Sequence, residues 1–144
     1  MLSVPVINQS PHPLPAYQSP GAAGADIHAW LKEPVCMPSG ARKIIETGLY
    51  VALPEGYEMQ VRPRSGLAWK HGVTVLNAPG TIDSDYRGEL KVLLWNTSQT
   101  AFWVEDGMRI AQLVVAPCLQ VQWQPQEQLL PTARHDGGYG HTGT

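Results

Sequence analysis

The chain has 144 residues, of which 43% are hydrophobic and 15% charged, and this balance excludes an intrinsically disordered protein. Ten Lys and Arg against 12 Asp and Glu give a formal net charge of -2, so the basic footprint typical of a nucleic-acid-binding protein is absent. The 14 Gly and 13 Pro disfavour helices, because proline breaks interior helical hydrogen bonds and glycine costs backbone entropy there. We therefore expect one compact, turn-rich, all-β domain.

The sequence gives no sign of a membrane span or of a disulfide scaffold. It holds no apolar run of about 18 residues, and the segment before Lys32 has none of the basic residues of a signal or transit peptide. The two cysteines, Cys36 and Cys118, stand far apart and form no metal-ligand pair. We expect a cytoplasmic protein that contacts neither membrane nor nucleic acid.

Short β-type segments follow one another along the chain, separated by turn signals. The proline-rich segment 8–25 precedes them and is expected to wrap the surface, whereas residues 65–71 can form one helical turn at most. Residues 119–123 alternate between apolar and polar, as in a strand with one wet face. The spacing favours a sandwich or a jelly-roll-like barrel. The expected strands cover residues 43–53, 57–62, 73–76, 90–95, 101–104, 109–116 and 119–123.

One loop carries residues suited to binding an anion. Arg64 can bind a phosphate through two N–H groups, Ser65 can donate its hydroxyl, and Gly66 lets backbone N–H groups approach. A second loop, 77–90, places Asp83 where a strand leaves the sheet, which suits a general base, and a hairpin is expected around Gly80. An ordinary turn is the alternative interpretation of each loop.

The last segment, residues 134–144, contains four glycines together with Arg134 and Tyr139. It is either a frayed terminus or a lid that orders over a ligand, because glycine-rich backbone exposes N–H groups for phosphate. We accordingly divide the chain into a β domain, 1–133, and a flexible lid, 134–144. The histidine spacing predicts no zinc site, whereas Mg²⁺ held through its waters by Asp26 and Gln112 is compatible with the sequence.

Five separated segments, taken together and in order, resemble the trimeric deoxyuridine triphosphatase (dUTPase) family. Each is modest alone, but their order and separations make a strong signal over nearly the whole chain. They are Ala-Gly-Ala-Asp-Ile (23–27), Pro-Arg-Ser-Gly-Leu-Ala (63–68), Gly-Thr-Ile-Asp-Ser-Asp-Tyr-Arg-Gly (80–88), Gly-Met-Arg-Ile-Ala-Gln-Leu (107–113) and Arg-His-Asp-Gly-Gly-Tyr-Gly-His-Thr-Gly (134–143).

The resemblance implies a jelly-roll-like distorted barrel of the β-clip type, assembled as a homotrimer with exchanged C-terminal arms and three shared active sites. It also implies hydrolysis of dUTP to dUMP and pyrophosphate with Mg²⁺, which limits uracil in DNA and supplies dUMP for dTMP synthesis. One subunit would supply Asp26, Arg64, Ser65, Gly66 and Gln112 to each site. A second subunit would supply residues 77–86, and a third its tail.

The resemblance also assigns roles. Asp83 would activate the attacking water, and Tyr86 would pack under the deoxyribose and leave no room for a 2′-hydroxyl. The remaining substrate-binding residues fall into three groups. Arg64, Ser65 and Gly66 would neutralise the α- and β-phosphates, and Gln112, also a substrate-binding residue, would together with Asp26 hold Mg²⁺ through its waters. Asn77, Gly80 and Thr81 would face uracil, and the tail would close over the nucleotide with Arg134, Gly138, Tyr139, His141 and Thr142.

Two alternatives stay open beside this interpretation. A related dCTP deaminase would need a catalytic glutamate in the strand after the 77–90 loop, where this chain has Leu93. A non-catalytic deoxynucleotide-binding module would be expected to have lost Asp83, Arg64 or Tyr86, and all are present. Met108 stands where the family usually has an acidic residue, and Asp106 is the candidate substitute partner for a nearby basic group.

Overall fold

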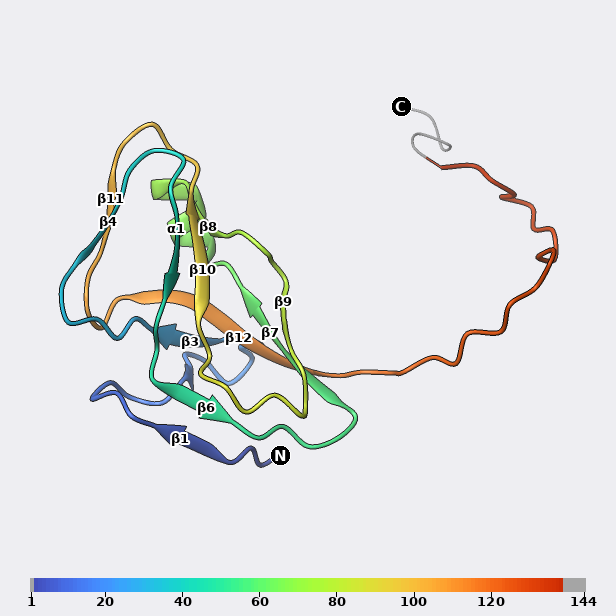
Figure 1. Cartoon of the computed structure of the whole chain (residues 1–144), viewed down its shortest axis with the longest axis horizontal. Helices are drawn as coiled ribbons and strands as arrows, with labels where there is room; N and C mark the ends of the chain where they lie inside the picture. The colour runs from blue at the N-terminus through green and yellow to red at the C-terminus, as the bar shows by residue number, and fades with distance from the viewer. Residues whose placement is uncertain (1, 139–144) are drawn as a thin grey trace.

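The computed structural model describes residues 2–138, which form twelve short β-strands and one helix (Figure 1). The expectation of a mostly β, jelly-roll-like barrel is confirmed. The strands are β1 (Val6–Asn8), β2 (Ala16–Tyr17), β3 (Ala25–His28), β4 (Val35–Met37), β5 (Arg42–Ile45), β6 (Leu49–Val51), β7 (Tyr57–Arg62), β8 (Val73–Val75), β9 (Gly80–Ile82), β10 (Val92–Asn96), β11 (Phe102–Val104) and β12 (Arg109–Pro117), and the helix is α1 (Ser65–His71).

The largest sheet has five strands in the order β2-β3-β12-β7-β9, and every pairing in it is antiparallel. Strand β12 lies at its centre, where Gln112 is paired with Asp26 on one side and with Arg62 on the other. Three smaller sheets, β1-β6, β5-β10-β8 and β11-β4, complete the barrel. The sheet order therefore brings segments from both halves of the chain to one place.

A single apolar core fills the barrel, and its members come from alternating strand positions. In β7, Met59 and Val61 point inward while the side chains between them face out, as the period of a strand requires. Ile27, Leu94 and Ile110 are among the completely buried side chains. Among residues 2–138, no helix is long and apolar enough to cross a membrane.

The expectation of one strand over residues 43–53 is wrong in detail. The segment is divided into β5 and β6 by a turn at Thr47 and Gly48. Gly48 has φ +70°, a conformation that other residues rarely adopt, and a Cβ there would lie 2.7 Å from the Trp30 ring. The glycine allows the chain to turn closely against Trp30.

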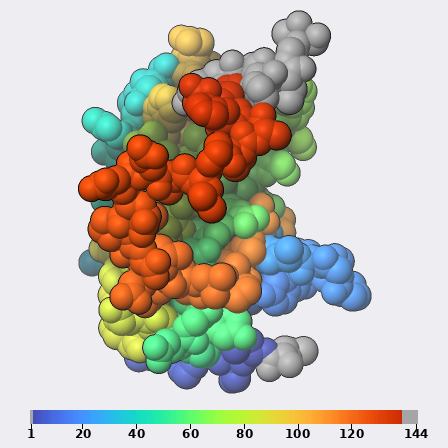
Figure 2. Space-filling view, turned by 90° about the vertical axis from the view of Figure 1, so that its right-hand side faces the viewer, coloured from blue at the N-terminus to red at the C-terminus, as the bar shows by residue number. Residues whose placement is uncertain are grey.

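The expectation of a strand over residues 119–123 is also wrong. Beyond β12 the chain leaves the barrel as an extended arm (Figure 1), and Leu119, Val121 and Trp123 are all exposed. The arm runs as an orange-to-red band in front of the barrel when this side is viewed directly (Figure 2). Alternation indicates which face of a strand is apolar, but a strand also needs a hydrogen-bonding partner. None is present among the described residues.

The 77–90 loop is arranged differently from a hairpin centred near Gly80. Gly80 instead opens strand β9, which pairs with β7 in the large sheet, so that Gly80 lies opposite Val61 and Ile82 opposite Met59. The helix is also longer than expected, because α1 has seven residues and ends at Gly72 with φ +63°. Both features place the candidate site residues at the margins of the large sheet.

Candidate active site

Asp26 is held between two arginines at the margin of the large sheet. Its Oδ1 accepts a hydrogen bond from Arg64 Nε at 3.0 Å, and its Oδ2 accepts one from Arg109 Nη1 at 3.1 Å. The Asp26 side chain is only 14% exposed. A carboxylate so far removed from water is stable because both of its oxygens are neutralised by guanidinium groups.

The orientation of Arg64 is fixed before any ligand binds. Besides the bond from Nε to Asp26, its Nη1 donates to the main-chain oxygen of Arg109 at 3.1 Å. Arg64 comes directly before helix α1, and the first helical residues, Ser65 and Gly66, are exposed. The first backbone N–H groups of a helix have no partner within it. A preoriented guanidinium thus lies beside free N–H donors, an arrangement suited to a phosphate group.

Gln112 lies next to Asp26 on the neighbouring strand. Its Nε2 donates to the carbonyl oxygen of Pro63 at 2.9 Å, which orients the amide and leaves Oε1 on the side of Gly24. A Cβ on Gly24 would lie 2.1 Å from this oxygen, so a side chain there would push the Gln112 amide out of its place. The Gln112 side chain thus presents an oxygen acceptor from the residue that is paired with Asp26.

The balance of charge at this cluster is positive, because two guanidinium groups surround one carboxylate. His28 lies on the same strand as Asp26, and its ring centroid is 6.1 Å from that of His12. Burial lowers the pKa of His28 below its ordinary value, and the nearby charges of His12 and Arg109 lower the pKa further. The surplus of positive charge at the cluster suits an anionic ligand, and the His28 ring takes up a proton less readily than a free imidazole.

We predict that His28 titrates below pH 6.5 in the native protein. Since the unfolded chain then binds more protons than the native one, the free energy of unfolding should fall as the pH drops below about 6.5. The NMR chemical shifts of the His28 ring, followed against pH, measure the pKa directly. In Arg109→Gln the pKa should move upward, and a native midpoint at or above 6.5 would show that burial and positive charge do not act on this ring.

Asp83 and Tyr86 lie on a second element, the loop that follows β9. The Tyr86 N–H donates to the Asp83 main-chain oxygen at 3.2 Å, which closes a turn between them. Arg87 Nη1 donates to the carbonyl oxygens of Ser84, at 2.7 Å, and Tyr86, at 2.8 Å. Asp83 and Tyr86 are both exposed, so the loop presents a carboxylate and an aromatic ring in a fixed relation.

Within one chain, these two elements are far apart. Asp83 follows Ile82, which is paired with Met59, whereas Asp26 is level with Arg62. Asp83 and Asp26 are therefore about 13 Å apart along the strands and about 14 Å apart across three strand spacings, which gives a distance of ~20 Å between them. Asp83 instead lines a hollow with Glu58 and Cys118. One chain thus cannot place Asp83 and Arg64 on the same phosphate.

The structure brings some of the predicted residues together and leaves others apart. Asp26, Arg64 and Gln112 form one cluster, with Ser65 and Gly66 next to it. The start of the 77–90 loop approaches Gln112, since Ala78, Pro79 and Gln112 line one shallow pocket. Asn77 Nδ2 would be 3.1 Å from a Cβ on Gly80, so this side chain packs against the first residue of β9, and Thr81 is exposed.

Of the predicted tail residues, Arg134 and Gly138 are described, and neither is hydrogen-bonded to either element in the single chain. Arg134 is exposed, and its Nε donates to Gly137 O at 2.9 Å within the arm itself. Gly138 is also exposed. The remaining predicted residues, Tyr139, His141 and Thr142, lie outside the described residues.

Arg109 is the functional candidate that the sequence interpretation did not identify, because its partner Asp26 is 83 positions away. A signal was present, since Arg109 begins the expected strand 109–116, which also contains Gln112. Asp106 does have a basic partner, since its carboxylate accepts from His12 Nε2 at 2.9 Å. The same carboxylate also accepts from the Leu31 N–H at 2.8 Å.

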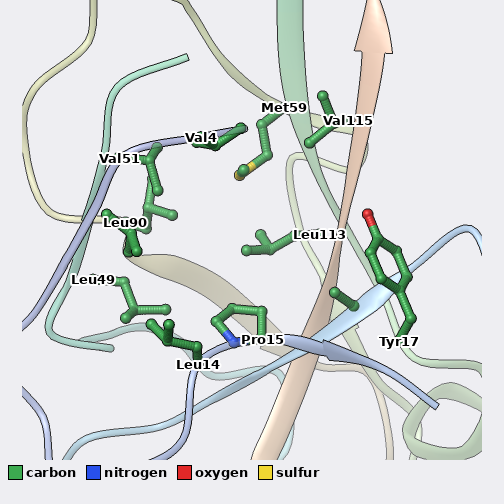
Figure 3. A pocket seen from close by; sticks show the side chains of 12 residues that line it. Val4, Leu14, Pro15, Tyr17, Leu49, Val51, Met59, Leu90, Leu113 and Val115 are labelled. Carbon is green, nitrogen blue, oxygen red and sulfur yellow. The ribbon is translucent and has the colours of Figure 1, made fainter. Parts of the chain in front are cut away.

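A pocket lined mainly by apolar side chains lies elsewhere (Figure 3). Its lining includes Leu49, Met59 and Leu113, whose side chains point into it from three strands. None of the predicted site residues lines it, and it offers few polar groups to orient a nucleotide. We therefore base the candidate site on the charged margin of the sheet.

The donor set fits Mg²⁺ held through water and does not fit a direct metal cage. Among residues 2–138, no three side chains from His, Cys, Asp and Glu are grouped as metal ligands. Asp26 and the Gln112 oxygen are the acceptors that lie together, and Asp26 is already bonded to two arginines. Mg²⁺ usually keeps several waters and is bound with substrate phosphates.

Fold and site together define a mostly β protein with a cluster of Asp26, Arg64 and Arg109 at the margin of its largest sheet. The model of the family described as dUTPase matches residues 10–143. The chain is 57% identical over 131 residues to a "Deoxyuridine 5'-triphosphate nucleotidohydrolase" of Chlamydia pneumoniae, covering 90% of each chain, and 54% identical over 132 residues to one of Roseobacter denitrificans, covering 91% of this chain and 87% of the relative. The chain belongs to the dUTPase family.

Solved structures support the same fold. A dUTPase of Staphylococcus bacteriophage 80alpha with dUpNHpp superimposes with a TM-score of 0.90 over all of both chains, at 24% identity. The dUTPase from phage phi11 of S. aureus gives a TM-score of 0.80 at 22% identity, covering 89% of this chain and 98% of that one. At these identities the likeness concerns the fold alone.

Proposed function

We propose that this protein hydrolyses dUTP to dUMP and pyrophosphate. The observation that carries the proposal is the Asp26–Arg64–Arg109 cluster with Gln112 beside it, in a chain that is 57% identical to a named deoxyuridine 5'-triphosphate nucleotidohydrolase. The preoriented guanidinium and the net positive charge suit a triphosphate. The product dUMP would serve dTMP synthesis, and removal of dUTP would limit uracil in DNA.

The active site that we propose is shared between subunits of a homotrimer. One subunit contributes Asp26, Arg64, Ser65, Gly66 and Gln112. A neighbour contributes the loop with Asp83 and Tyr86, and the third contributes its arm. The support is the separation of about 20 Å between Asp83 and Asp26 in one chain, which is too large for joint action on one phosphate. An arm that extends from the barrel with exposed apolar side chains is consistent with an exchange between subunits.

In this site Asp83 accepts a proton from the water that attacks the α-phosphorus in line. The water oxygen forms the new bond to phosphorus, the bond from the α-phosphorus to the bridging oxygen breaks, and pyrophosphate leaves. Arg64, Ser65 and the N–H of Gly66 stabilise the charge on the phosphate oxygens. Mg²⁺, when bound through waters on Asp26 and Gln112, neutralises charge on the triphosphate. Positioning and electrostatics then carry most of the rate enhancement.

The nucleoside is recognised by the Asp83–Tyr86 element and the strand before it. Asn77, Gly80 and Thr81 face uracil, where buried donors and acceptors left unpaired by cytosine would disfavour dCTP. The Tyr86 ring lies under the deoxyribose. Arg134, Gly138, Tyr139, His141 and Thr142 belong to the lid that closes over the phosphates and the base. Both cysteines are free in the structure, which suits the reducing cytoplasm that we propose as its location.

Deletion of residues 134–144 should leave a folded trimer that has lost most of its activity. The described part of this segment, residues 134–138, makes no contribution to the apolar core, so the melting temperature should stay close to that of the full chain. Loss of the lid contacts should raise KM for dUTP and lower kcat/KM by about a hundredfold. Pyrophosphate release measures the activity and analytical ultracentrifugation the assembly. Full activity in the shortened chain would show that residues 134–144 do not act as a lid.

The proposed function is tested by pyrophosphate release with Mg²⁺ from dUTP, dTTP, dCTP and UTP in parallel. We expect rapid release from dUTP and little from the other three nucleotides. Absence of release from dUTP would reject the proposed function. Equal release of pyrophosphate from all four nucleotides would reject the assignment of Asn77, Gly80 and Thr81 to uracil and of Tyr86 to the deoxyribose.

A further inference from the structure

The ring of Tyr86 lies directly against the backbone of Gly88. A Cβ added to Gly88 would be 2.3 Å from the Tyr86 hydroxyl oxygen, 2.5 Å from Cζ and 2.9 Å from Cε2. Any side chain at position 88 would therefore displace the ring. The glycine is not required by its own backbone conformation, because it does not have a positive φ. Position 88 needs a glycine because the Tyr86 ring approaches its backbone so closely.

The other constraint on Tyr86 comes from Glu89. The Tyr86 hydroxyl donates to the main-chain oxygen of Glu89 at 3.0 Å. Glu89 is itself firmly anchored: its Oε1 accepts from the N–H groups of Thr47, at 3.1 Å, and Gly48, at 2.9 Å. The next residue, Leu90, is 1% exposed and donates its N–H to Leu49 O at 2.7 Å.

Tyr86 is thus held at both ends. The Asp83–Tyr86 turn fixes its backbone, and the bond to Glu89 fixes the tip of its ring to the buried connection between β5 and β6. The ring is nevertheless 43% exposed, so it has a free surface to offer to a ligand. A solvent-facing tyrosine without such supports would move freely between rotamers.

We propose that Gly88 and Glu89 are the positioning residues that make this site reject ribonucleotides. The inference rests on the proposed function, in which Tyr86 lies under the sugar. If the Tyr86 ring could move away from the sugar, it would reject an added 2′-hydroxyl only weakly. Rejection of this single oxygen therefore requires a ring that is held in place. Gly88 sets how deep the ring lies, and the Glu89 carbonyl sets where its tip points.

The test is the ratio of kcat/KM for dUTP to kcat/KM for UTP in four proteins: the unmodified chain, Gly88→Ala, Tyr86→Phe and Gly21→Ala. Gly88→Ala should lower the ratio by about tenfold or more, because it displaces the ring. Tyr86→Phe keeps the ring and removes only the bond to Glu89, so it should lower the ratio by about three- to tenfold. Gly21→Ala is the matched control, since a Cβ there meets nothing within 4 Å, and it should leave the ratio unchanged.

The ratio of kcat/KM for dUTP to kcat/KM for UTP distinguishes a positioning role from a role in stability. A purely structural defect would lower the activities on dUTP and on UTP together and leave their ratio unchanged. Tyr86→Phe removes one exposed oxygen and keeps the test valid if Gly88→Ala does not fold. Ratios that stay at the unmodified value in Tyr86→Phe and in folded Gly88→Ala overturn the inference while the proposed function stands. An unmodified chain that does not hydrolyse dUTP rejects the proposed function, and the inference with it.

Discussion

The Asp83→Asn variant is expected to lose about 10²- to 10⁴-fold in kcat for dUTP hydrolysis, the range typical for removal of a general base. Asparagine has nearly the same shape as aspartate but cannot accept the proton of the attacking water. The turn between Asp83 and Tyr86 uses the main-chain oxygen of residue 83, so the substitution leaves this turn in place. Affinity for a non-hydrolysable dUTP analogue, measured by calorimetry, should therefore change little.

Asp85→Asn is the matched control for this variant. Asp85 is an exposed carboxylate in the same loop and lines the same hollow as Asp83, so it reports the effect of removing one negative charge there. We expect Asp85→Asn to retain most of the activity. Turnover of Asp83→Asn at the unmodified rate would show that another group activates the water.

The Arg64→Gln variant should lose about 10²- to 10³-fold in kcat/KM, because a donor aimed at charge that develops in the transition state is worth about 3–4 kcal/mol. The substitution also leaves the buried carboxylate of Asp26 with Arg109 as its remaining arginine partner. Since Asp26 is 14% exposed, some loss of stability should accompany the loss of activity.

Arg42→Gln provides the control, since Arg42 is an exposed arginine on β5, a strand of a different sheet. It should retain the activity and the melting temperature of the unmodified chain. Melting followed by circular dichroism separates folding from catalysis in both variants. An Arg64→Gln protein with unchanged kcat/KM would show that this guanidinium does not bind the reacting phosphates.

Local patterns predicted the parts of this structure that depend on neighbouring residues. The bounds of β7 agree with the expected strand at 57–62, because its residues alternate strictly between the core and the outside. The order Pro63-Arg64-Ser65-Gly66 after this strand correctly predicted that helical structure begins there. Period and turn chemistry are properties of adjacent residues, and both can be read from the sequence.

Long-range pairing could not be obtained in this way. The contact of Asp26 with Arg109 depends on the pairing of β3 with β12, which no local pattern reports. Residues 119–123 show the converse, since their alternation is genuine but the chain supplies no adjacent strand among the described residues. Likewise, the close contact of the Tyr86 ring with the backbone of Gly88 exists only in the folded loop and could not be predicted from the sequence.

The central claim of this account is that catalysis uses Asp83 of one subunit and Arg64 of another. It is tested most directly by denaturing Asp83→Asn and Arg64→Gln chains together in equal amounts, refolding them, and measuring dUTP hydrolysis. Each variant alone should be nearly inactive. When the two chains mix at random, about one quarter of all sites, counted over pure and mixed trimers together, would combine an intact Arg64 from one chain with an intact Asp83 from another, so about a quarter of the unmodified activity should return. If both residues act within one chain, no mixture can restore a complete site, and an inactive mixed preparation of folded trimers would contradict the claim.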